Sequence, residues 1–175
     1  MKLSELQPGE YADYYAQYLA MLDPQIELLS GLEKSKETVG AFFKEIPLDK
    51  QGFRYEAGKW SIKEVFQHLI DSERIFMHRC FRIGRLDATP LPGFEQNDYI
   101  IPSGADQKSL ENLLEEFHTS RDFGIALVKS LSPEALAQKG TASEFPVTAR
   151  GAAFTVLGHE QWHLKIIRER YLSLI

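Results

Sequence analysis

The sequence predicts an all-α fold, a four-helix bundle with a long crossover between its second and third helices and an extra helix at the N-terminus. Apolar residues recur at spacings of three and four along four long stretches, which is typical of helices that pack together. No stretch shows a competing strand-like alternation, and residues 84–106, rich in proline and glycine, separate the second long stretch from the third. The chain of 175 residues is long enough for a hydrophobic core, so we expect residues 1–175 to form a single domain.

The extra N-terminal helix is expected over residues 10–22. Its aromatic and apolar residues recur at helical spacing: Tyr11, Tyr14, Tyr15, Tyr18, Leu19 and Leu22. Asp23 and Pro24 are typical of a helix start, with Asp23 as the N-cap and Pro24 at the first helical position. The first bundle helix therefore follows them and ends at Pro47, with an apolar stripe of Leu29, Leu32, Val39, Phe43 and Ile46.

The second bundle helix begins with a capping box, in which Ser61 is the cap and Glu64 reaches back to it. It is expected to run to about Arg82, with an apolar stripe of Ile62, Val65, Leu69, Phe76 and Ile83. Residues 84–106 then form a long irregular crossover. Such long connections are uncommon in compact domains and are often functional.

The third bundle helix is predicted from Leu110 to Leu131, and residues 132–134 are typical of the cap of a further short helical turn. Residues 139–149 are expected to form a loop or a small hairpin. The last helix runs from about Thr148 to the C-terminus, with inward-facing residues Ala153, Val156, His163, Ile167, Tyr171 and Leu174.

Composition excludes several classes of protein. The net charge is −5 and no long basic run is present, which argues against nucleic acid as a partner. No apolar run reaches the roughly 18 residues of a membrane span, and the first residues turn polar at once, unlike a signal peptide. Cys80 is the only cysteine, so no intrachain disulfide can form. We expect a cytoplasmic protein in a reducing environment.

Two histidines in the last helix, His159 and His163, belong to an H-E-x-x-H motif. Residues four apart project from the same face of a helix, so a divalent metal can bind both imidazoles. In a metalloprotease the motif needs a third ligand downstream, but only residues 164–175 follow, and their one acid, Glu169, lies two turns away. The motif is therefore better interpreted as part of a metal site whose third ligand comes from upstream.

His68 is the best candidate for that third ligand, because its well-capped helix is expected to face the last helix. Its position flanks the apolar stripe, and Asp71 and Ser72 lie on the same face, where Asp71 could orient the imidazole. His78, near the far end of the same helix, and His118, among charged residues, are weaker candidates.

These residues resemble the DinB/YfiT-like superfamily. The resemblance rests on Trp60-Ser61-x-x-Glu64-x-x-x-His68-x-x-Asp71-x-Glu73, Arg79, Gly93–Tyr99, Arg121 and His159-x-x-x-His163, and it covers the chain from about residue 25 to the end. It implies a bundle in up-down-down-up order, with His68, His159 and His163 as ligands of a divalent metal, either zinc or nickel. Three protein ligands leave positions open, as in catalytic rather than structural sites.

The resemblance also implies a class of chemistry. Relatives include transferases that use low-molecular-weight thiols, a mycothiol-dependent isomerase and proteins assigned as hydrolases. A metal-activated thiol or water would then attack a small-molecule substrate. Glu160 is our candidate for proton transfer, and an ordinary hydrogen-bonded acid is the alternative. Arg79, Arg121, Asn97, Asp98 and Tyr99 are candidate pocket residues, or else members of ion pairs and of a polar loop.

A second function remains open, namely a non-catalytic metal-binding or stress-response bundle that acts through dimerisation or a partner. It is suggested by the stripe formed by Tyr11, Tyr14, Tyr15 and Tyr18, which could cover a neighbouring subunit in a homodimer. Packing within one chain is the alternative for the same stripe.

Overall fold

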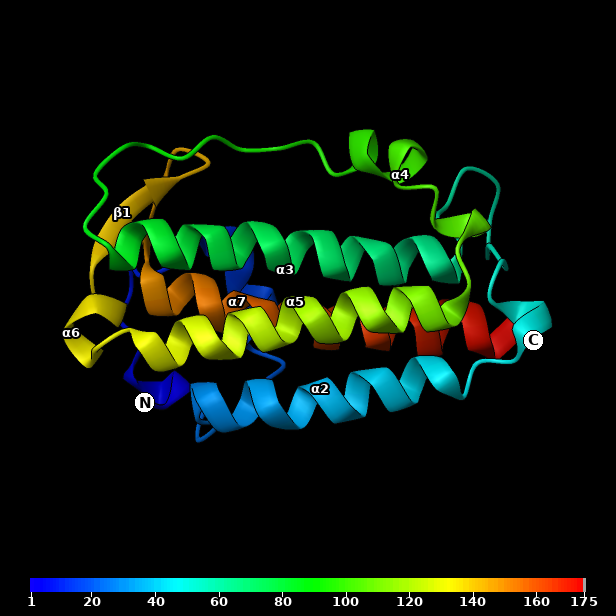
Figure 1. Cartoon of the computed structure of the whole chain (residues 1–175), viewed down its shortest axis with the longest axis horizontal. Coiled ribbons are helices and arrows are strands. Elements are labelled where there is room, and N and C mark those ends of the chain that lie inside the picture. The colour runs from blue at the N-terminus through cyan, green and yellow to red at the C-terminus, as the bar shows by residue number, and fades with distance from the viewer. Residues whose placement is uncertain (175) are drawn as a thin grey trace.

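The computed structural model describes residues 1–174 and confirms the predicted four-helix bundle (Figure 1). Its long helices are α2 (Leu28–Lys44), α3 (Ile62–Gly84), α5 (Leu110–Ser130) and α7 (Ala149–Ile166). α3 and α5 run parallel to each other and opposite to α2 and α7, which is the up-down-down-up order (Figure 1). α2 and α3 occupy opposite corners, because each packs mainly against α5 and α7.

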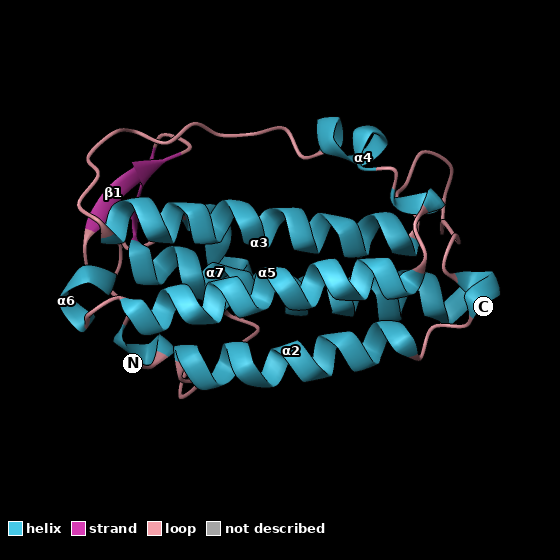
Figure 2. Cartoon of the chain, in the orientation of Figure 1, coloured by secondary structure: helices cyan, strands magenta, loops and turns pink. Residues whose placement is uncertain are grey.

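Shorter elements complete the chain (Figure 2). The short α-helices are α1 (Ala16–Leu19), α4 (Asn97–Ser103) and α6 (Pro133–Leu136). Single 3₁₀ turns lie at Leu3–Glu5, Asp13–Tyr15, Leu48–Lys50, Ala105–Gln107 and Leu172–Leu174, and a π-helical turn, Ile167–Tyr171, extends α7. The predicted hairpin is formed by β1 (Lys139–Ala142) and β2 (Phe145–Thr148), with Lys139 opposite Thr148.

The helix starts follow their local sequence signals. The Ser61 hydroxyl accepts a hydrogen bond from the backbone N–H of Glu64, whose carboxylate accepts one from the Ser61 N–H at 2.7 Å, so the capping box is confirmed. Ser109, Ser132 and Thr148 cap α5, α6 and α7 in the same way. Each cap satisfies a backbone donor that the first helical turn leaves free.

An N-terminal helix is present but much shorter than predicted, because residues 10–22 hold only a 3₁₀ turn and the four-residue α1. Asp23 does not cap α2. It accepts a hydrogen bond from the Gln25 N–H at 2.8 Å, and α2 begins at Leu28. The first residues of the chain pair with this segment, since the Leu3 N–H donates to the carbonyl of Ile26 at 3.0 Å. Tertiary pairing has overridden the local helical signal here.

The crossover differs from an irregular loop, because it contains α4 and a 3₁₀ turn. Its first part is attached to the hairpin, where the Leu91 N–H donates to the Thr141 carbonyl and the Ser143 N–H donates to the Leu91 carbonyl. At the end of the last helix, Leu174 was predicted to face the core, but it is 62% exposed, so this prediction is wrong.

The core consists of two apolar clusters. One lies toward the hairpin and includes Leu32, Phe76, Ile125 and Leu157, and the other lies toward the opposite end and includes Val39, Leu69, Phe117 and Leu164. Between them lies a group of buried polar residues, one from each bundle helix, that is centred on the guanidinium of Arg121: Ser35, Glu73, Arg121 and Glu160. We call these four residues the polar layer.

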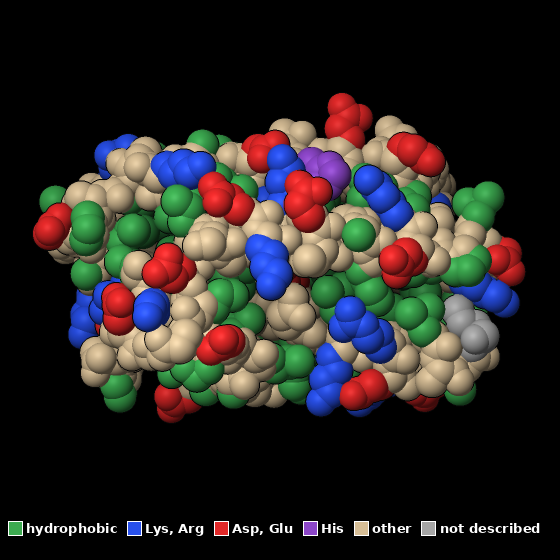
Figure 3. Space-filling view, turned by 90° about the horizontal axis from the view of Figure 1, so that it is seen from below, with side chains coloured by type: hydrophobic (Ala, Val, Ile, Leu, Met, Phe, Trp, Pro, Cys, Tyr) green, Lys and Arg blue, Asp and Glu red, His purple; other side chains and the backbone are tan. Residues whose placement is uncertain are grey.

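The surface shows no marked segregation of charge on the face drawn in Figure 3, where acidic and basic side chains are interspersed. None of the helices described in residues 1–174 combines the length and hydropathy that crossing a membrane requires.

Gly158 sets how closely α1 approaches α7. A Cβ atom at this position would lie 2.7 Å from the carbonyl carbon and oxygen of Tyr18, which are backbone atoms that cannot rotate away. The close approach brings the Tyr18 ring against the neighbouring histidine, with 5.4 Å between the centroids of Tyr18 and His159. A residue without a side chain is therefore needed here.

We predict that Gly158→Ala lowers the free energy of unfolding by about 1–3 kcal/mol, because the clash with backbone outweighs the better helix propensity of alanine. Urea denaturation measures the change. Gly52→Ala is the control, since a Cβ at Gly52 meets nothing within 4 Å. A Gly158→Ala protein as stable as the wild type would contradict the close packing of α1 on α7.

Candidate metal centre

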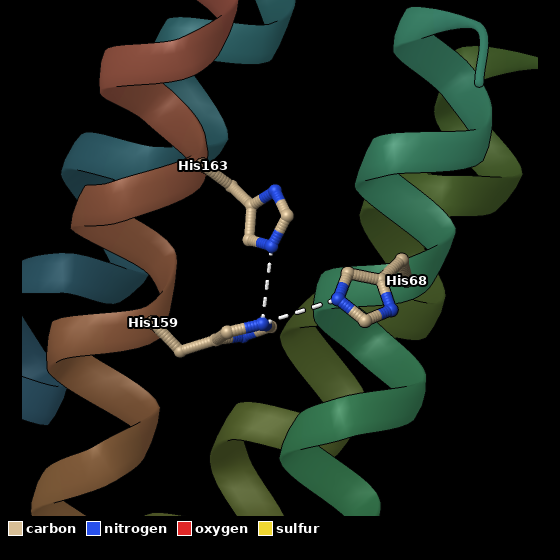
Figure 4. A group of neighbouring side chains, drawn as sticks. All are labelled: His68, His159 and His163. Carbon is tan, nitrogen blue, oxygen red and sulfur yellow. Dashed lines mark hydrogen bonds between the residues drawn. The ribbon is translucent and has the colours of Figure 1, made fainter. Parts of the chain in front are cut away.

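Three histidines meet in the interface between α3 and α7 (Figure 4). The Nε2 atom of His159 lies 3.1 Å from Nε2 of His68 and 3.1 Å from Nε2 of His163. One ring nitrogen from each residue lies within 4.8 Å of the others. His68 and His159 are buried, and His163 is partly buried. The structure therefore brings together the three histidines that the sequence singled out.

Local packing holds the His68 ring in place. The Ser72 hydroxyl lies 3.4 Å from Nδ1 of His68, one turn along α3, and the Trp60 ring packs against the imidazole with 4.8 Å between centroids. Asp71 does not orient His68, contrary to prediction. Its Oδ1 accepts hydrogen bonds from Arg74 at 3.0 Å and from Gln67 at 3.1 Å instead. An arginine at i+3 on the same helix competes successfully for the carboxylate.

His159 is enclosed by aromatic rings. The centroid of Tyr18 lies 5.4 Å from that of His159, and the centroid of Phe76 lies 5.8 Å away. These rings come from α1 and α3, so the imidazole is covered from two elements. This packing contributes to the burial of His159, which is 6% exposed.

Burial keeps the three imidazoles neutral. It lowers the pKa of His68 to about 3 and that of His163 to about 4, and it holds the pKa of His159 well below its ordinary value. The neighbouring histidines lower the pKa of His68 and of His159 further. Neutral imidazole is the form that binds metal ions.

The donor set fits a divalent ion. Nitrogen ligands placed about 2.0–2.1 Å from a tetrahedral ion are roughly 3.3–3.4 Å apart. The two Nε2 separations of 3.1 Å are close to that value. Imidazole ligands suit zinc and nickel alike.

His78 is exposed on the surface, and His118 is partly buried beside Gly40, so neither joins the cluster.

A cavity of about 310 Å³ opens beside His159. Its walls come from α3, from the crossover and from the N-terminal segment, where Tyr14, Tyr15 and Tyr18 line it. Three tyrosines of the stripe thus line a cavity within one chain, and Tyr11 packs against the core cluster nearer the hairpin. The spacing of these tyrosines does not predict this role, because the path of the N-terminal segment over α7 depends on distant contacts.

The crossover residues that line this cavity are residues 93–96. Asn97, Asp98 and Tyr99, which we expected there, begin α4, and Asp98 and Tyr99 border a separate surface groove. Arg79 does not line the cavity beside His159 either. Its guanidinium donates to the Ser143 hydroxyl at 2.7 Å and to the Pro92 carbonyl at 3.2 Å, and so ties the crossover to the hairpin.

Arg121 is the centre of the polar layer and joins all four bundle helices. Its Nε and Nη2 donate to the two oxygens of Glu73 at 2.7 Å and 3.1 Å, and Nη2 also donates to Oε2 of Glu160 at 2.6 Å. Nη1 donates to the Leu32 carbonyl at 3.2 Å and to the Ser35 hydroxyl. Every N–H of the guanidinium is thereby used, and the two carboxylates raise the pKa of Arg121.

Glu160 points its carboxylate into this layer. Burial raises its pKa, and Arg121 opposes that effect. The described residues contain no hydrogen bond between Glu160 and the three imidazoles, and its Oε1 atom is buried without a partner. A role of Glu160 in proton transfer stays a prediction.

Comparisons with known proteins agree with this architecture. A family model described as the DinB superfamily matches residues 32–167. No curated protein matches the chain. The structure is similar to YfiT from Bacillus subtilis, described as a probable metal-dependent hydrolase with an unusual four-helix bundle topology, with a TM-score of 0.73 and 14% identity over 97% of this chain and 94% of that one. A DinB-like protein from Bacillus subtilis has a TM-score of 0.60 and 16% identity over 84% of this chain and 90% of that one.

We predict that Arg121→Met lowers the free energy of unfolding by about 3–5 kcal/mol, because Glu73 and Glu160 would remain buried without a counter-charge. Urea denaturation measures the loss. Lys129→Met is the matched control on the same helix, since its ion pair with Glu33 is exposed and we expect a change of less than about 1 kcal/mol. Equal effects of the two substitutions would contradict a structural role for the polar layer.

The stability of the metal-free protein should fall as the pH falls below about 6.5. An unfolded chain takes up protons on its histidines near pH 6.5, whereas in the folded chain the pKa of His68 is about 3. The unfolded state therefore binds more protons between these values, and His68 alone contributes a loss of about 2 kcal/mol between pH 7 and pH 5.

Urea denaturation at pH 7 and pH 5, with a chelator present, checks this prediction. His68→Gln should show a shallower dependence on pH than the wild type, and His78→Gln, on the exposed face of the same helix, serves as the control. A His68→Gln protein with the same pH dependence as the wild type would show that His68 titrates alike in both states.

Proposed function

The chain belongs to the DinB superfamily, and from this premise we propose that it is a metal-dependent enzyme whose divalent ion is bound by His68, His159 and His163. The observation that carries the proposal is the convergence of three neutral imidazole nitrogens within 4.8 Å. YfiT, which shares the fold, is described as a probable metal-dependent hydrolase, and this description supports the same class here. We further propose that residues 1–175 form one DinB-like domain.

The proposed chemistry follows from the number of ligands. Three protein ligands leave a divalent ion with an open position, which is characteristic of catalytic sites. When bound, zinc or nickel would supply Lewis acidity, which lowers the pKa of a water molecule or a low-molecular-weight thiol toward neutrality. The activity is then a hydrolysis if water is the nucleophile, and an S-transfer if a thiol is.

The residues of the chain prepare the site for a small-molecule substrate. Ser72 and Trp60 hold the ring of His68, and the Tyr18 and Phe76 rings pack against His159. The cavity of about 310 Å³ beside His159 has room for a small substrate.

Tyr18 can contribute a hydrogen-bond donor to this cavity. Its hydroxyl lies 2.9 Å from the Tyr14 hydroxyl, and burial together with Tyr14 raises its pKa well above the ordinary value. The phenol therefore stays protonated and can donate to a polar group of the substrate. Glu160, our first candidate for proton transfer, is the alternative, although its contact with Arg121 favours a role in positioning His159.

A second candidate function is a non-catalytic metal-binding bundle that acts through a homodimer or a partner. The observation that favours it is the exposure of Tyr14, which lines the cavity and is itself 62% exposed. Light scattering would detect a dimer. A dimer that binds the metal but turns over no substrate would favour this function over the enzyme.

We predict that protein purified without a chelator contains about one divalent ion per chain, and that alanine at His68, His159 or His163 lowers metal affinity by at least about tenfold. Elemental analysis and a metal titration measure this. His78→Ala and His118→Ala are the matched controls and should retain the metal. Absence of metal, together with unchanged stability of His68→Ala and His163→Ala, would sink the proposal.

The reaction class is tested by assaying the zinc-loaded and nickel-loaded proteins separately. Each is given small ester and amide substrates without thiol, and electrophiles with a low-molecular-weight thiol. Turnover without thiol identifies a hydrolase, and turnover that depends on thiol identifies a transferase. Loss of the activity in His163→Ala, but not in His78→Ala, assigns it to the histidine cluster.

A further inference from the structure

A second buried arginine, Arg79 on α3, has surroundings that differ from those of Arg121. It is 3% exposed. In the part of the chain that the structure describes it forms no ion pair, and its hydrogen bonds go to neutral oxygens: the Ser143 hydroxyl at 2.7 Å, the Pro92 carbonyl at 3.2 Å and the Tyr15 hydroxyl at 3.5 Å. A buried charge without a counter-charge is unfavourable, so the molecule is expected to attract an anion to this region.

Arg79 lies directly behind one wall of the cavity of about 310 Å³ that adjoins the histidine cluster. Its guanidinium forms hydrogen bonds with Tyr15 and Ser143, which line that cavity. The rings of Phe76 and Phe94 line it too, and their centroids lie 5.9 Å and 6.0 Å from the central carbon of the guanidinium. A charge so close to the wall and withdrawn from water is weakly screened, so its field extends into the cavity.

Two hydroxyl groups in front of this charge can donate to a ligand. A guanidinium only donates, so the oxygens of Ser143 and Tyr15 accept from Arg79, and their own O–H groups have no other partner among residues 1–174. Both residues are partly exposed, so a ligand in the cavity reaches them although Arg79 itself is covered. Two free donors backed by a positive charge suit a carboxylate.

One acidic residue, Glu95, also lines the cavity. It is exposed, and its Oε1 atom accepts hydrogen bonds at 2.9 Å from the backbone and the side chain of Asn97 at the start of α4. Water and salt screen an exposed carboxylate more strongly than a buried guanidinium. Glu95 therefore reduces the attraction for an anion without cancelling it.

The cavity extends along one face of α3 from the histidine cluster toward Arg79. Ser72 and Phe76, which line it, follow His68 by four and eight residues, and Arg79 follows by eleven. At the helical rise per residue, His68 and Arg79 are about 16 Å apart along the axis. The Phe76 ring contacts both the His159 ring and the Arg79 guanidinium. A substrate would therefore place its reacting group near His159 and an anionic group toward the two hydroxyls.

We propose that this cavity binds a small aromatic carboxylate, whose carboxylate group accepts hydrogen bonds from the Ser143 and Tyr15 hydroxyls in front of Arg79. Its ring packs among the aromatic side chains that line the cavity. The inference rests on the proposed function in taking this cavity as the substrate site, and it specifies the class of substrate. A neutral amide of the same shape lacks the charge, and an amine is repelled by Arg79.

Nitrogen-15 NMR titrations of the metal-free protein at pH 7, with a chelator present, test this with sodium benzoate, benzamide and benzylammonium chloride at constant ionic strength. We expect benzoate to cause saturable shifts of amides around the cavity, such as those of Gly93, Gln96 and Ser143. Affinity for benzamide should be at least about tenfold lower, and benzylammonium should not bind. Equal binding of benzoate and benzamide, preferred binding of benzylammonium, or no saturable shift with benzoate would overturn the proposal.

Variants assign the charge. Arg79→Gln should weaken benzoate binding at least about tenfold. Arg85→Gln is the matched control, because it removes the same charge from the exposed end of α3 and should change the affinity less than about twofold. Glu95→Gln should strengthen binding. If Arg79→Gln does not fold, Ser143→Ala decides the question, since loss of its hydroxyl should weaken benzoate binding about tenfold. Unchanged affinity in Arg79→Gln or Ser143→Ala would contradict the assignment.

The titration and the assays of the proposed enzyme can fail independently. Benzoate binding in a protein that holds no metal would contradict the enzyme and support the carboxylate site, and turnover of neutral esters without benzoate binding would do the reverse. His68→Ala should leave the titration unchanged, because His68 does not line the cavity. Loss of benzoate binding in His68→Ala would place the carboxylate at the histidine cluster and overturn the assignment to the Arg79 wall.

Discussion

The buried guanidinium of Arg121 is the contact on which the bundle depends. It joins α5 to each of the other three long helices through Ser35, Glu73 and Glu160, and it lies between the two apolar clusters. A buried charge tolerates little displacement, because each lost hydrogen bond leaves a group desolvated without a partner. A shift of one helix by a turn would therefore break these hydrogen bonds in addition to the apolar packing. We therefore regard the polar layer as the element that sets the axial register of the four helices.

The register set by the polar layer is also the register that the histidines require. Glu160 directly follows His159 in the chain, and Glu73 lies on the same helix as His68. When Arg121 holds both carboxylates, it holds the two backbones from which the imidazoles project. A shift of α7 by one turn would separate Glu160 from Arg121 and would also carry His159 away from His68. The histidine cluster is thus preorganised by an ion cluster that does not touch its ring nitrogens.

Local signals explain which parts of this arrangement the sequence predicts. A capping box at Ser61 and histidines four residues apart involve neighbours in the chain, so their geometry follows from the helix alone. The N-terminal segment could not be predicted in this way. Its tyrosines have helical spacing, yet its backbone is committed to distant partners, as where the Thr148 N–H donates to the Glu10 carbonyl at 3.0 Å. In the sequence Arg121 is recognisable only as a charged residue on an otherwise apolar stripe. Its partners on three other helices can be identified only from the fold.

The glutamate of the H-E-x-x-H motif has different contacts here from those that a metalloprotease requires. Helical spacing alone does not distinguish the two cases, because the glutamate projects about 60° from the second histidine in any H-E-x-x-H helix. In a protease the glutamate must reach the activated water, and a general base must lie within hydrogen-bond distance of the proton it takes. In this chain one carboxylate oxygen of Glu160 is bound to Arg121, and the other has no hydrogen-bond partner. The helix therefore presents two different surfaces, because one contributes His159 and His163 to the histidine cluster while Glu160 on the other contacts Arg121 in the polar layer.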